Sequence, residues 1–287
     1  MRQGNGAMVT VIGLGQMGLA MAGRLMATGG EVSGWDLDAG RRAAAMALGV
    51  AATETAAAPV VILSLPNAAV VARVLPDLLS RMAPGGVVID CSTLEPEAAR
   101  SFAAAAEAAG VAYLDAPVSG GPGGAAAGTL TVMIGGPAAA LALVQPTLAR
   151  IAARVVHVGG SGAGQVAKLV NNLLVATHLV VAAEALRLGA AAGVAVEQLL
   201  PVLNAASGRS AATEVNWPRW IASGGFDSGF SAGLMRKDVR LALALAEGLG
   251  VPLDATARAG LAWEKVRVPD AADFNRVASA IFEGEGA

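Results

Sequence analysis

A glycine-rich turn near the start of the chain has the composition of a phosphate-binding loop. It comprises Gly13, Leu14, Gly15, Gln16, Met17 and Gly18, which fit the pattern G-x-G-x-x-G. The turn follows an apolar run of strand length, residues 8–12, and opens a segment of helical composition. In that setting the backbone N–H groups at the start of the helix face a pyrophosphate, so the segment predicts a dinucleotide-binding turn.

An acidic residue lies at the position where dinucleotide-binding turns of this type have one that contacts the ribose. Asp36 stands at the end of a second predicted strand, 18 residues beyond Gly18. A carboxylate at this place accepts hydrogen bonds from the adenosine ribose and repels a 2′-phosphate, which favours NAD as the cofactor. Arg41 and Arg42 lie close by in the sequence and could serve a 2′-phosphate, so NADP stays open. A glycine turn that binds no nucleotide is the structural alternative.

The first half of the chain alternates short apolar runs with Ala-rich helical runs. Near-continuous apolar runs are typical of parallel strands buried on both faces, and their alternation with helices predicts a doubly wound sheet. The predicted strands are residues 8–12, 31–36, 60–64, 87–90, 111–114, 129–134 and 154–158, and the predicted helices are 16–28, 97–109 and 137–150. Residues 121–124, rich in Gly and Pro, read as a loop.

The alternation of strand and helix patterns ends at the glycine-rich segment 159–164, and no strand pattern recurs after it. The helical patterns there cover residues 163–192, 196–204, 214–222, 234–249, 252–268 and 271–282. We therefore expect an α/β fold. A Rossmann-type NAD(P)-binding domain (1–162) precedes an all-helical substrate and oligomerisation domain (163–287), and the long helix 163–192 joins the two.

Composition excludes several classes of protein. Hydrophobic residues make up 55% of the chain and charged residues 15%, which excludes a disordered chain. The formal charge of −2 provides no positive field for nucleic acid or anionic lipid. One cysteine and two histidines offer little for a metal site, and none is expected. Residues 1–7 show no targeting signal, and the apolar stretch 166–188 carries too many polar residues for a membrane span, so a cytoplasmic protein is expected.

Four segments, in this order, resemble the β-hydroxyacid dehydrogenase family, which includes 3-hydroxyisobutyrate dehydrogenase and tartronate semialdehyde reductase. Residues 13–22 read GLGQMGLAMA, 115–121 DAPVSGG, 162–172 GAGQVAKLVNN and 234–238 LMRKD. The resemblance spans residues 8 to about 282. It implies an NAD(P)-dependent oxidoreductase that oxidises a short 3-hydroxy acid to its semialdehyde, or catalyses the reverse reduction.

The resemblance assigns catalysis to Lys168 and Asn172. Lys168 matches the family's catalytic lysine, which takes the hydroxyl proton in oxidation and protonates the carbonyl oxygen in reduction, a role that suits a buried amine. Asn172 lies one helical turn further on, so both side chains share a face. Asn171 either joins them or faces the second domain. The structural alternative for Lys168 is a solvated charge on a helix.

The resemblance also implies the remaining contacts. Ser119, Gly120 and Gly121 match the family's clamp for the substrate carboxylate, which Lys168 and Asn172 complete. The implied cofactor contacts are Leu65, Pro66 and Thr93 after the third and fourth predicted strands, and Lys237 in the helical domain, with Ser92, Asp238 and Phe230 beside them. Ordinary loops and surface charge are the structural alternatives.

Two other functions stay open: an imine reductase-like enzyme and a dinucleotide-binding protein without turnover. Lys168 counts against both, because such relatives commonly depart from lysine there. The apolar surface of helix 163–192 exceeds what one small domain can cover, which predicts a homodimer or homotetramer built through the helical domain. The sequence leaves the acid and the direction open. Ser207, Arg209 and Ser210 lie in the segment where substrate choice is expected.

Overall fold

The computed structural model of the chain describes residues 8–53 and 58–284. It divides into two units, residues 1–168 and 169–287, and the division falls inside one continuous helix. It falls beyond the boundary placed at 162/163 from the sequence, because the first turn of that helix is bonded to the first unit. The segment 1–7, in which no targeting signal is expected, lies outside the described residues.

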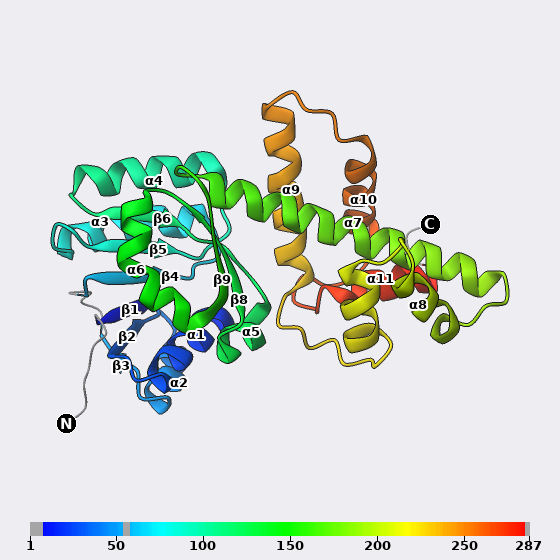
Figure 1. Ribbon diagram of the computed structural model, residues 1–287, viewed down its shortest axis with the longest axis horizontal. Coiled ribbons are helices and arrows are strands. Elements are labelled where there is room, and N and C mark those ends of the chain that lie inside the picture. The colour runs from blue at the N-terminus through cyan, green and yellow to red at the C-terminus, as the bar shows by residue number, and fades with distance from the viewer. Residues whose placement is uncertain (1–7, 54–57, 285–287) are drawn as a thin grey trace. The chain divides into compact units, whose positions relative to one another are not determined.

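The described part of the first unit is built on a sheet with the strand order β3-β2-β1-β4-β5-β6-β8-β7, and β9 pairs with the other side of β8 (Figure 1). The strands are β1 (Val9–Ile12), β2 (Val32–Trp35), β3 (Ala51–Ala52), β4 (Val60–Leu63), β5 (Val87–Asp90), β6 (Ala112–Asp115), β7 (Val118–Ser119), β8 (Leu130–Gly135) and β9 (Ala152–Gly159). β1 to β6 run parallel, whereas β8 runs antiparallel to β6 and β7.

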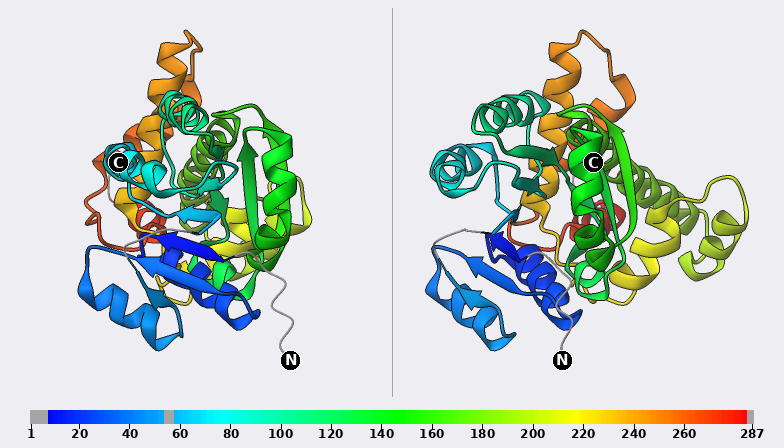
Figure 2. Two further views of the ribbon diagram at one scale, coloured as in Figure 1. Left: turned by 90° about the vertical axis from the view of Figure 1, so that its left-hand side faces the viewer. Right: turned by 60° about the vertical axis from the view of Figure 1, so that its left-hand side comes forward.

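Helices cover both faces of this sheet (Figure 2). They are α1 (Gln16–Ala27), α2 (Ala39–Ala47), α3 (Ala68–Arg81), α4 (Pro96–Ala108), α5 (Gly121–Ala127) and α6 (Ala138–Ile151). In β4, Val60 and Ile62 pack in one core with α1 and α6, while Val61 and Leu63 pack in another with α3 and α4. The doubly wound sheet predicted from the near-continuous apolar runs is therefore confirmed.

Several elements were not predicted from the sequence. All seven predicted strands are present, but α2, α3 and the two-residue strands β3 and β7 were not predicted. The loop expected at residues 121–124 is wrong, since α5 begins at Gly121. This helix is made of Gly, Pro and Ala, so its own propensity is poor; burial of Ala125 in the core against α1 stabilises it instead.

The second unit is built from helices, and its described residues contain no β-strand beyond one isolated bridge between Ser231 and Asp273. It contains most of α7 (Ala163–Ala191), followed by α8 (Val196–Ala205), a π-helix η1 (Ala212–Ile221), α9 (Ala232–Gly248), α10 (Asp254–Lys265) and α11 (Asn275–Glu283). By length and composition α7 could cross a membrane, but half of its apolar window is buried within the protein. Leu179 and Leu186 of α7 lie in the core of the unit, and the Nε1–H of the buried Trp263 donates to the Ala176 carbonyl at 3.0 Å.

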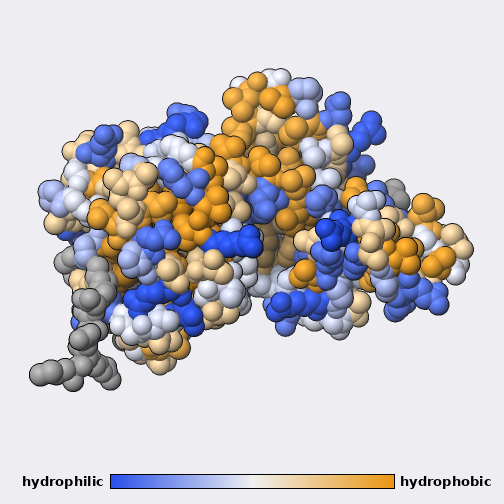
Figure 3. Space-filling view, in the orientation of Figure 1, coloured by the Kyte–Doolittle hydropathy of each residue, from blue (hydrophilic) through white to orange (hydrophobic). Residues whose placement is uncertain are grey.

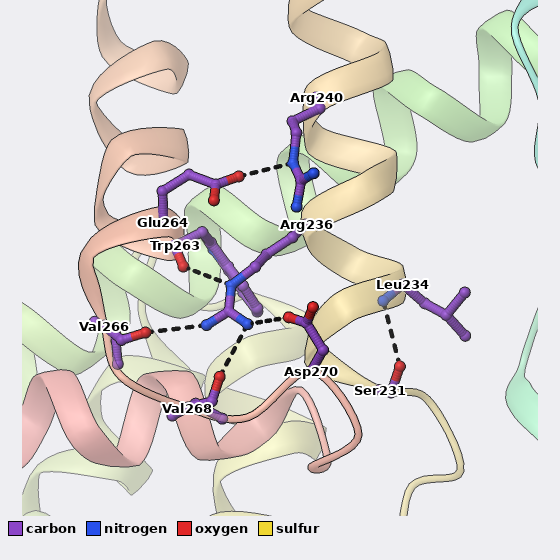
Figure 4. Close-up of polar contacts among 9 residues, drawn as sticks. All are labelled: Ser231, Leu234, Arg236, Arg240, Trp263, Glu264, Val266, Val268 and Asp270. Atoms are coloured by element: carbon purple, nitrogen blue, oxygen red, sulfur yellow. Dashed lines mark hydrogen bonds and ion pairs between the residues drawn. The ribbon is translucent and has the colours of Figure 1, made fainter.

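Arg236 on α9 holds the end of α10 in place (Figure 4). Its guanidinium donates to the carbonyls of Trp263, Val266 and Val268 at 2.8 to 3.0 Å, and to Asp270 Oδ1 at 2.6 Å. The last carbonyls of a helix have no partner within the helix, so this buried arginine satisfies groups at the end of α10 and in the turn beyond it. One turn further along α9, Arg240 pairs with Glu264 at the surface.

Replacing Arg236 is expected to destabilise the helical unit strongly. Arg236→Met leaves buried carbonyls without donors and should lower the free energy of unfolding by about 3 kcal/mol. Arg240→Met is the matched control on the same helix, because its ion pair is exposed and is worth less than about 1 kcal/mol. Chemical denaturation followed by tryptophan fluorescence measures both. Equal losses for the two variants would contradict the role given to Arg236.

Candidate functional site

Two of the three glycines in the turn differ from the third in the space around them. Gly13 has φ +90°, and a Cβ there would lie 2.3 Å from the Ser64 carbonyl oxygen. A Cβ at Gly18 would lie 1.8 Å from the Gly13 oxygen. Packing therefore requires these two glycines. A Cβ at Gly15 would meet nothing nearer than Arg41 Nη1 at 4.0 Å, so the protein leaves open space at this position.

That open space lies at the start of α1. Gly15 is the N-cap of the helix, and no side chain caps it. The first N–H groups of a helix lack partners within the helix and attract anions. The turn thus offers room and backbone donors together, which fits the pyrophosphate of a dinucleotide.

Asp36 ties the end of β2 to this turn. Its Oδ2 accepts the Leu14 N–H at 2.8 Å, and its Oδ1 accepts the Asp38 N–H at 2.9 Å. Partial burial alone would raise the pKa of Asp36, but these hydrogen bonds and the nearby Arg41 guanidinium, 3.4 Å away, lower it below its ordinary value. The carboxylate is held ionised beside the turn, and its remaining lone pairs suit ribose hydroxyls.

The two arginines near Asp36 are placed differently. Arg41 is exposed and forms the ion pair with Asp36. Arg42 stacks over Trp35, 4.6 Å from the ring centroid, and donates to the carbonyls of Asp36 and Leu37. A carboxylate and a guanidinium therefore share the region in which a ribose 2′ position is read, which is compatible with NAD and leaves NADP possible.

Ser92 connects the loops that follow β4 and β5. Its Oγ accepts the Leu65 N–H at 2.9 Å, its N–H donates to Asp90 Oδ1 at 2.9 Å, and its carbonyl accepts Gln165 Nε2 at 2.9 Å. The segments that contain Leu65–Pro66 and Thr93 are thus fixed at one edge of the sheet. This is the edge where open α/β sheets bind ligands.

Asp90 anchors this connection from inside the sheet. It is fully buried and accepts the Tyr113 hydroxyl at 2.5 Å as well as the Ser92 N–H. Burial raises the pKa of Asp90 to about 6, against the opposing effect of the hydrogen bonds from Ser92 and Tyr113.

The first turn of α7 is attached to the same edge. Asp115, at the end of β6, accepts the N–H groups of Gly162 and Gln165 at 2.8 and 3.0 Å. A Cβ at Gly164 would lie 2.5 Å from the Met133 carbonyl oxygen, so the helix touches the sheet backbone. Lys168 follows on the next turn and is buried, with 8% of its surface exposed. The sheet edge therefore carries a lysine of low exposure, which argues against a solvated surface charge.

The predicted clamp lies at the end of β7. Gly120 and Gly121 have φ values of +127° and +64°, which account for both glycines through the backbone alone. The Ser119 hydroxyl is the side-chain donor of this segment, and Ser119 is half-buried. The positive φ values explain the two glycines without a ligand, so Ser119 is the side chain that distinguishes a clamp from an ordinary turn.

In the second unit a buried carboxylate joins Asn172 and Lys237. Asp238 Oδ2 accepts Asn172 Nδ2 at 2.6 Å, and its Oδ1 lies 3.2 Å from Lys237 Nζ. Asn171 Nδ2 donates to Asn172 Oδ1 at 3.1 Å. The orientation of the Asn172 amide is therefore fixed from both sides.

Several aromatic and histidine side chains have contacts within the protein. The ring of Phe230, which was expected beside the cofactor contacts, packs edge-to-face against Phe274, and the buried Trp217 against Phe282. His157 Nε2 pairs with the Gly136 carbonyl at 2.8 Å. Among the described residues no group of three His, Cys, Asp or Glu side chains could hold a metal ion. The sequence analysis assigned no role to Gln165 or Asp90. The available signals for Gln165 were its polarity between apolar neighbours and its place in the family segment 162–172.

Comparisons with known proteins agree on one family. Residues 8–159 match the NAD binding domain of 6-phosphogluconate dehydrogenase, and residues 162–281 match the family described as NAD-binding of NADP-dependent 3-hydroxyisobutyrate dehydrogenase. The chain belongs to the β-hydroxyacid dehydrogenase family. Accordingly, it is an NAD(P)-dependent oxidoreductase of hydroxy acids.

Relatives match over most of their length. The chain is 41% identical to 2-(hydroxymethyl)glutarate dehydrogenase of Eubacterium barkeri, covering 86% of this chain and 85% of that one. It is 42% identical to the NAD-dependent L-serine dehydrogenase of Pseudomonas aeruginosa, with coverage of 82% and 83%. The solved structure of Mycobacterium tuberculosis 3-hydroxyisobutyrate dehydrogenase with L-serine has a TM-score of 0.90 at 35% identity, covering 96% and 99%. A Streptomyces aurantiacus imine reductase, 22% identical with a TM-score of 0.64, shares the fold alone.

Two glycines of the turn in this dehydrogenase, Gly15 and Gly18, should respond differently to a methyl group. Gly15→Ala is expected to fold normally and to weaken NAD binding by about tenfold or more, because the methyl group occupies the space that the pyrophosphate needs. Gly18→Ala should destabilise the first unit instead. Gly248→Ala, at the end of α9, is the neutral control, because an added methyl group there would meet no atom within 4 Å. Calorimetric titration with NAD and a melting curve separate these effects. Unchanged NAD affinity in folded Gly15→Ala would contradict the assignment.

Proposed function

We propose that this protein transfers a hydride between NAD, or NADP, and a short 3-hydroxy acid, with Lys168 as the general acid and base. The observation that carries the proposal is the burial of Lys168 on a helical turn that is hydrogen-bonded to the sheet edge beside Thr93. An amine held in a poorly solvated place is suited to exchanging a proton with a substrate oxygen. When bound, the nicotinamide supplies the hydride acceptor or donor.

The catalytic and substrate-binding residues have separate roles. Lys168 takes the hydroxyl proton during oxidation and returns it to the carbonyl oxygen during reduction. Asn172 lies four residues further along the same helix, on the same face, and its amide hydrogen-bonds the substrate. The Ser119 hydroxyl and neighbouring backbone N–H groups, including those of Gly120 and Gly121, hold the carboxylate.

Other residues contact the cofactor. The N–H groups at the start of α1 hold the pyrophosphate, and Asp36 accepts from the adenosine ribose. Leu65, Pro66 and Thr93 line the nicotinamide half at the sheet edge. Lys237 contacts the cofactor from the helical domain, and Asp238 orients both Lys237 and Asn172.

Removing the lysine amine should abolish turnover without abolishing cofactor binding. For Lys168→Met, kcat is expected to fall by about 10³-fold, within the range that proton transfer by a positioned side chain contributes, while the Kd for NAD changes little. Lys265→Met, an exposed lysine on α10, is the control. The assay follows reduced nicotinamide with 3-hydroxyisobutyrate, L-serine and 2-(hydroxymethyl)glutarate, and with both cofactors.

The outcomes separate the candidate functions. Activity that survives in Lys168→Met overturns the proton-transfer role. NAD binding without turnover on any acid, aldehyde or imine favours a binding protein, and turnover on imines alone favours an imine reductase.

We also propose that the enzyme is a cytoplasmic homodimer or homotetramer assembled through its helical unit. Leu174, Val181 and Leu188 of α7 follow each other at seven-residue spacing and are 47%, 49% and 72% exposed. Leu249 at the end of α9 and Leu261 within α10 are further exposed hydrophobic side chains. Figure 3 shows hydrophobic surface over parts of the helical unit. A stripe at heptad spacing is the pattern with which one helix packs on another.

Light scattering after size-exclusion chromatography tests the assembly. The wild type should elute as a dimer or tetramer, and Leu174→Glu with Val181→Glu should shift it toward monomer. Leu143→Glu, an exposed position on α6 of the first unit, should leave the mass unchanged. A monomeric wild type at micromolar concentration contradicts this proposal.

A further inference from the structure

We infer that Gln165 is the positioning residue that sets Lys168 against the Thr93 loop, and that it acts through both hydrogen bonds of its side-chain amide. The inference rests on the proposed role of Lys168. It goes beyond that role because Gln165 touches neither substrate nor cofactor in the mechanism above.

The amide of Gln165 spans the loop that contains Thr93. Its Oε1 accepts the Leu94 N–H at 3.0 Å, and its Nε2 donates to the Ser92 carbonyl at 2.9 Å. One side chain thus pairs with the backbone on both sides of Thr93, as a neighbouring strand would. The pairing needs an acceptor and a donor side by side, which few side chains provide at this length.

Burial raises the free-energy cost of losing either hydrogen bond. Gln165 and Leu94 are fully buried, and Ser92 is 3% exposed. Water cannot replace a lost partner at such a place, so an unmade bond costs the desolvation of the group left behind. The loop and the first turn of α7 therefore keep one relative position.

The backbone of Gln165 is fixed independently of its side chain. Asp115 Oδ2 accepts the Gln165 N–H at 3.0 Å, and Asp115 Oδ1 accepts that of Gly162 at 2.8 Å. Gln165 and Lys168 are three residues apart on α7 and lie on one face. With the helix anchored on β6, the amide of Gln165 determines where the Thr93 loop stands relative to the lysine.

The first test removes both hydrogen bonds at nearly constant volume. Gln165→Met should lower kcat by about 30-fold, because a displacement on the order of 1 Å at a reacting group costs up to about 100-fold. The Kd for NAD, which depends mainly on the glycine turn, should change by less than about threefold. A primary isotope effect with substrate deuterated at the hydroxyl-bearing carbon should increase as hydride transfer becomes slower.

Thr10→Val is the matched control. Thr10 Oγ1 and Ser33 Oγ form a buried hydrogen bond of 2.8 Å inside the same sheet, away from the loop. This variant also loses a buried hydrogen bond, and it should retain the wild-type kcat and isotope effect. A Gln165→Met enzyme that behaves like this control overturns the inference.

The second test asks whether a protonated glutamic acid at position 165 restores the donor and the acceptor of the amide. A protonated carboxyl offers an O–H donor and a carbonyl acceptor in the arrangement of the amide, whereas a carboxylate faces the Ser92 carbonyl without a donor. As the pH is lowered, the kcat of Gln165→Glu relative to wild type should therefore rise by about tenfold per pH unit while the introduced group is mostly ionised. The titratable and charged groups around it are Asp90 on β5, Asp115 on β6, Arg100 on α4 and Lys168 on α7. They are shared with wild type, so the ratio removes the part of the pH dependence that wild type also shows.

A ratio that stays low and flat across pH overturns the inference even where Gln165→Met fails to fold. Full activity of Gln165→Met beside an inactive Lys168→Met overturns this inference alone. Full activity of Lys168→Met overturns the proposed function and, with it, the role of Gln165.

Discussion

The arrangement of the site depends on a carboxylate that caps a helix from another element. Asp115 ends β6 and takes the N–H groups that the start of α7 cannot satisfy by itself. Burial raises the pKa of Asp115, and the backbone hydrogen bonds from Gly162, Gln165 and Gly164 oppose that rise. The cap makes the opening turn of α7 part of the sheet, although most of the helix belongs to the second unit. The position of Lys168 is therefore fixed by hydrogen bonds from this turn to β6 and to the loop after β5, unlike that of a residue on a surface helix.

The helical unit combines three roles within one short segment. Arg236, Lys237 and Asp238 follow one another on α9, so their side chains leave the helix in different directions. Arg236 satisfies carbonyls at and beyond the end of α10, Asp238 holds the Asn172 amide, and Lys237 stays 27% exposed beside Asp238. A structural residue, an orienting residue and a proposed cofactor contact thus occupy consecutive positions.

The features that could be predicted from the sequence are those whose pattern lies within a single segment. The glycine turn, Asp36 and the long helix are read within single elements, and the strands of the sheet are recognisable because both of their faces are buried. Contacts between distant segments carry no such signal. Gln165 bonds to Ser92 across 73 positions and Asp115 to Gln165 across 50, and no periodicity marks either pair. α5 was missed because its stability comes from packing and not from helix propensity.

The most direct test of the central claim is amide hydrogen exchange along α7. If the Asp115 cap joins its first turn to the sheet, residues 162–168 exchange as slowly as β5 and β6 in the wild type. In Asp115→Asn they should exchange about tenfold to a hundredfold faster, as expected for losing a buried hydrogen bond to a charged group, while residues 176–186 stay unchanged. Fast exchange of the first turn in the wild type, or no effect of Asp115→Asn, would contradict the account.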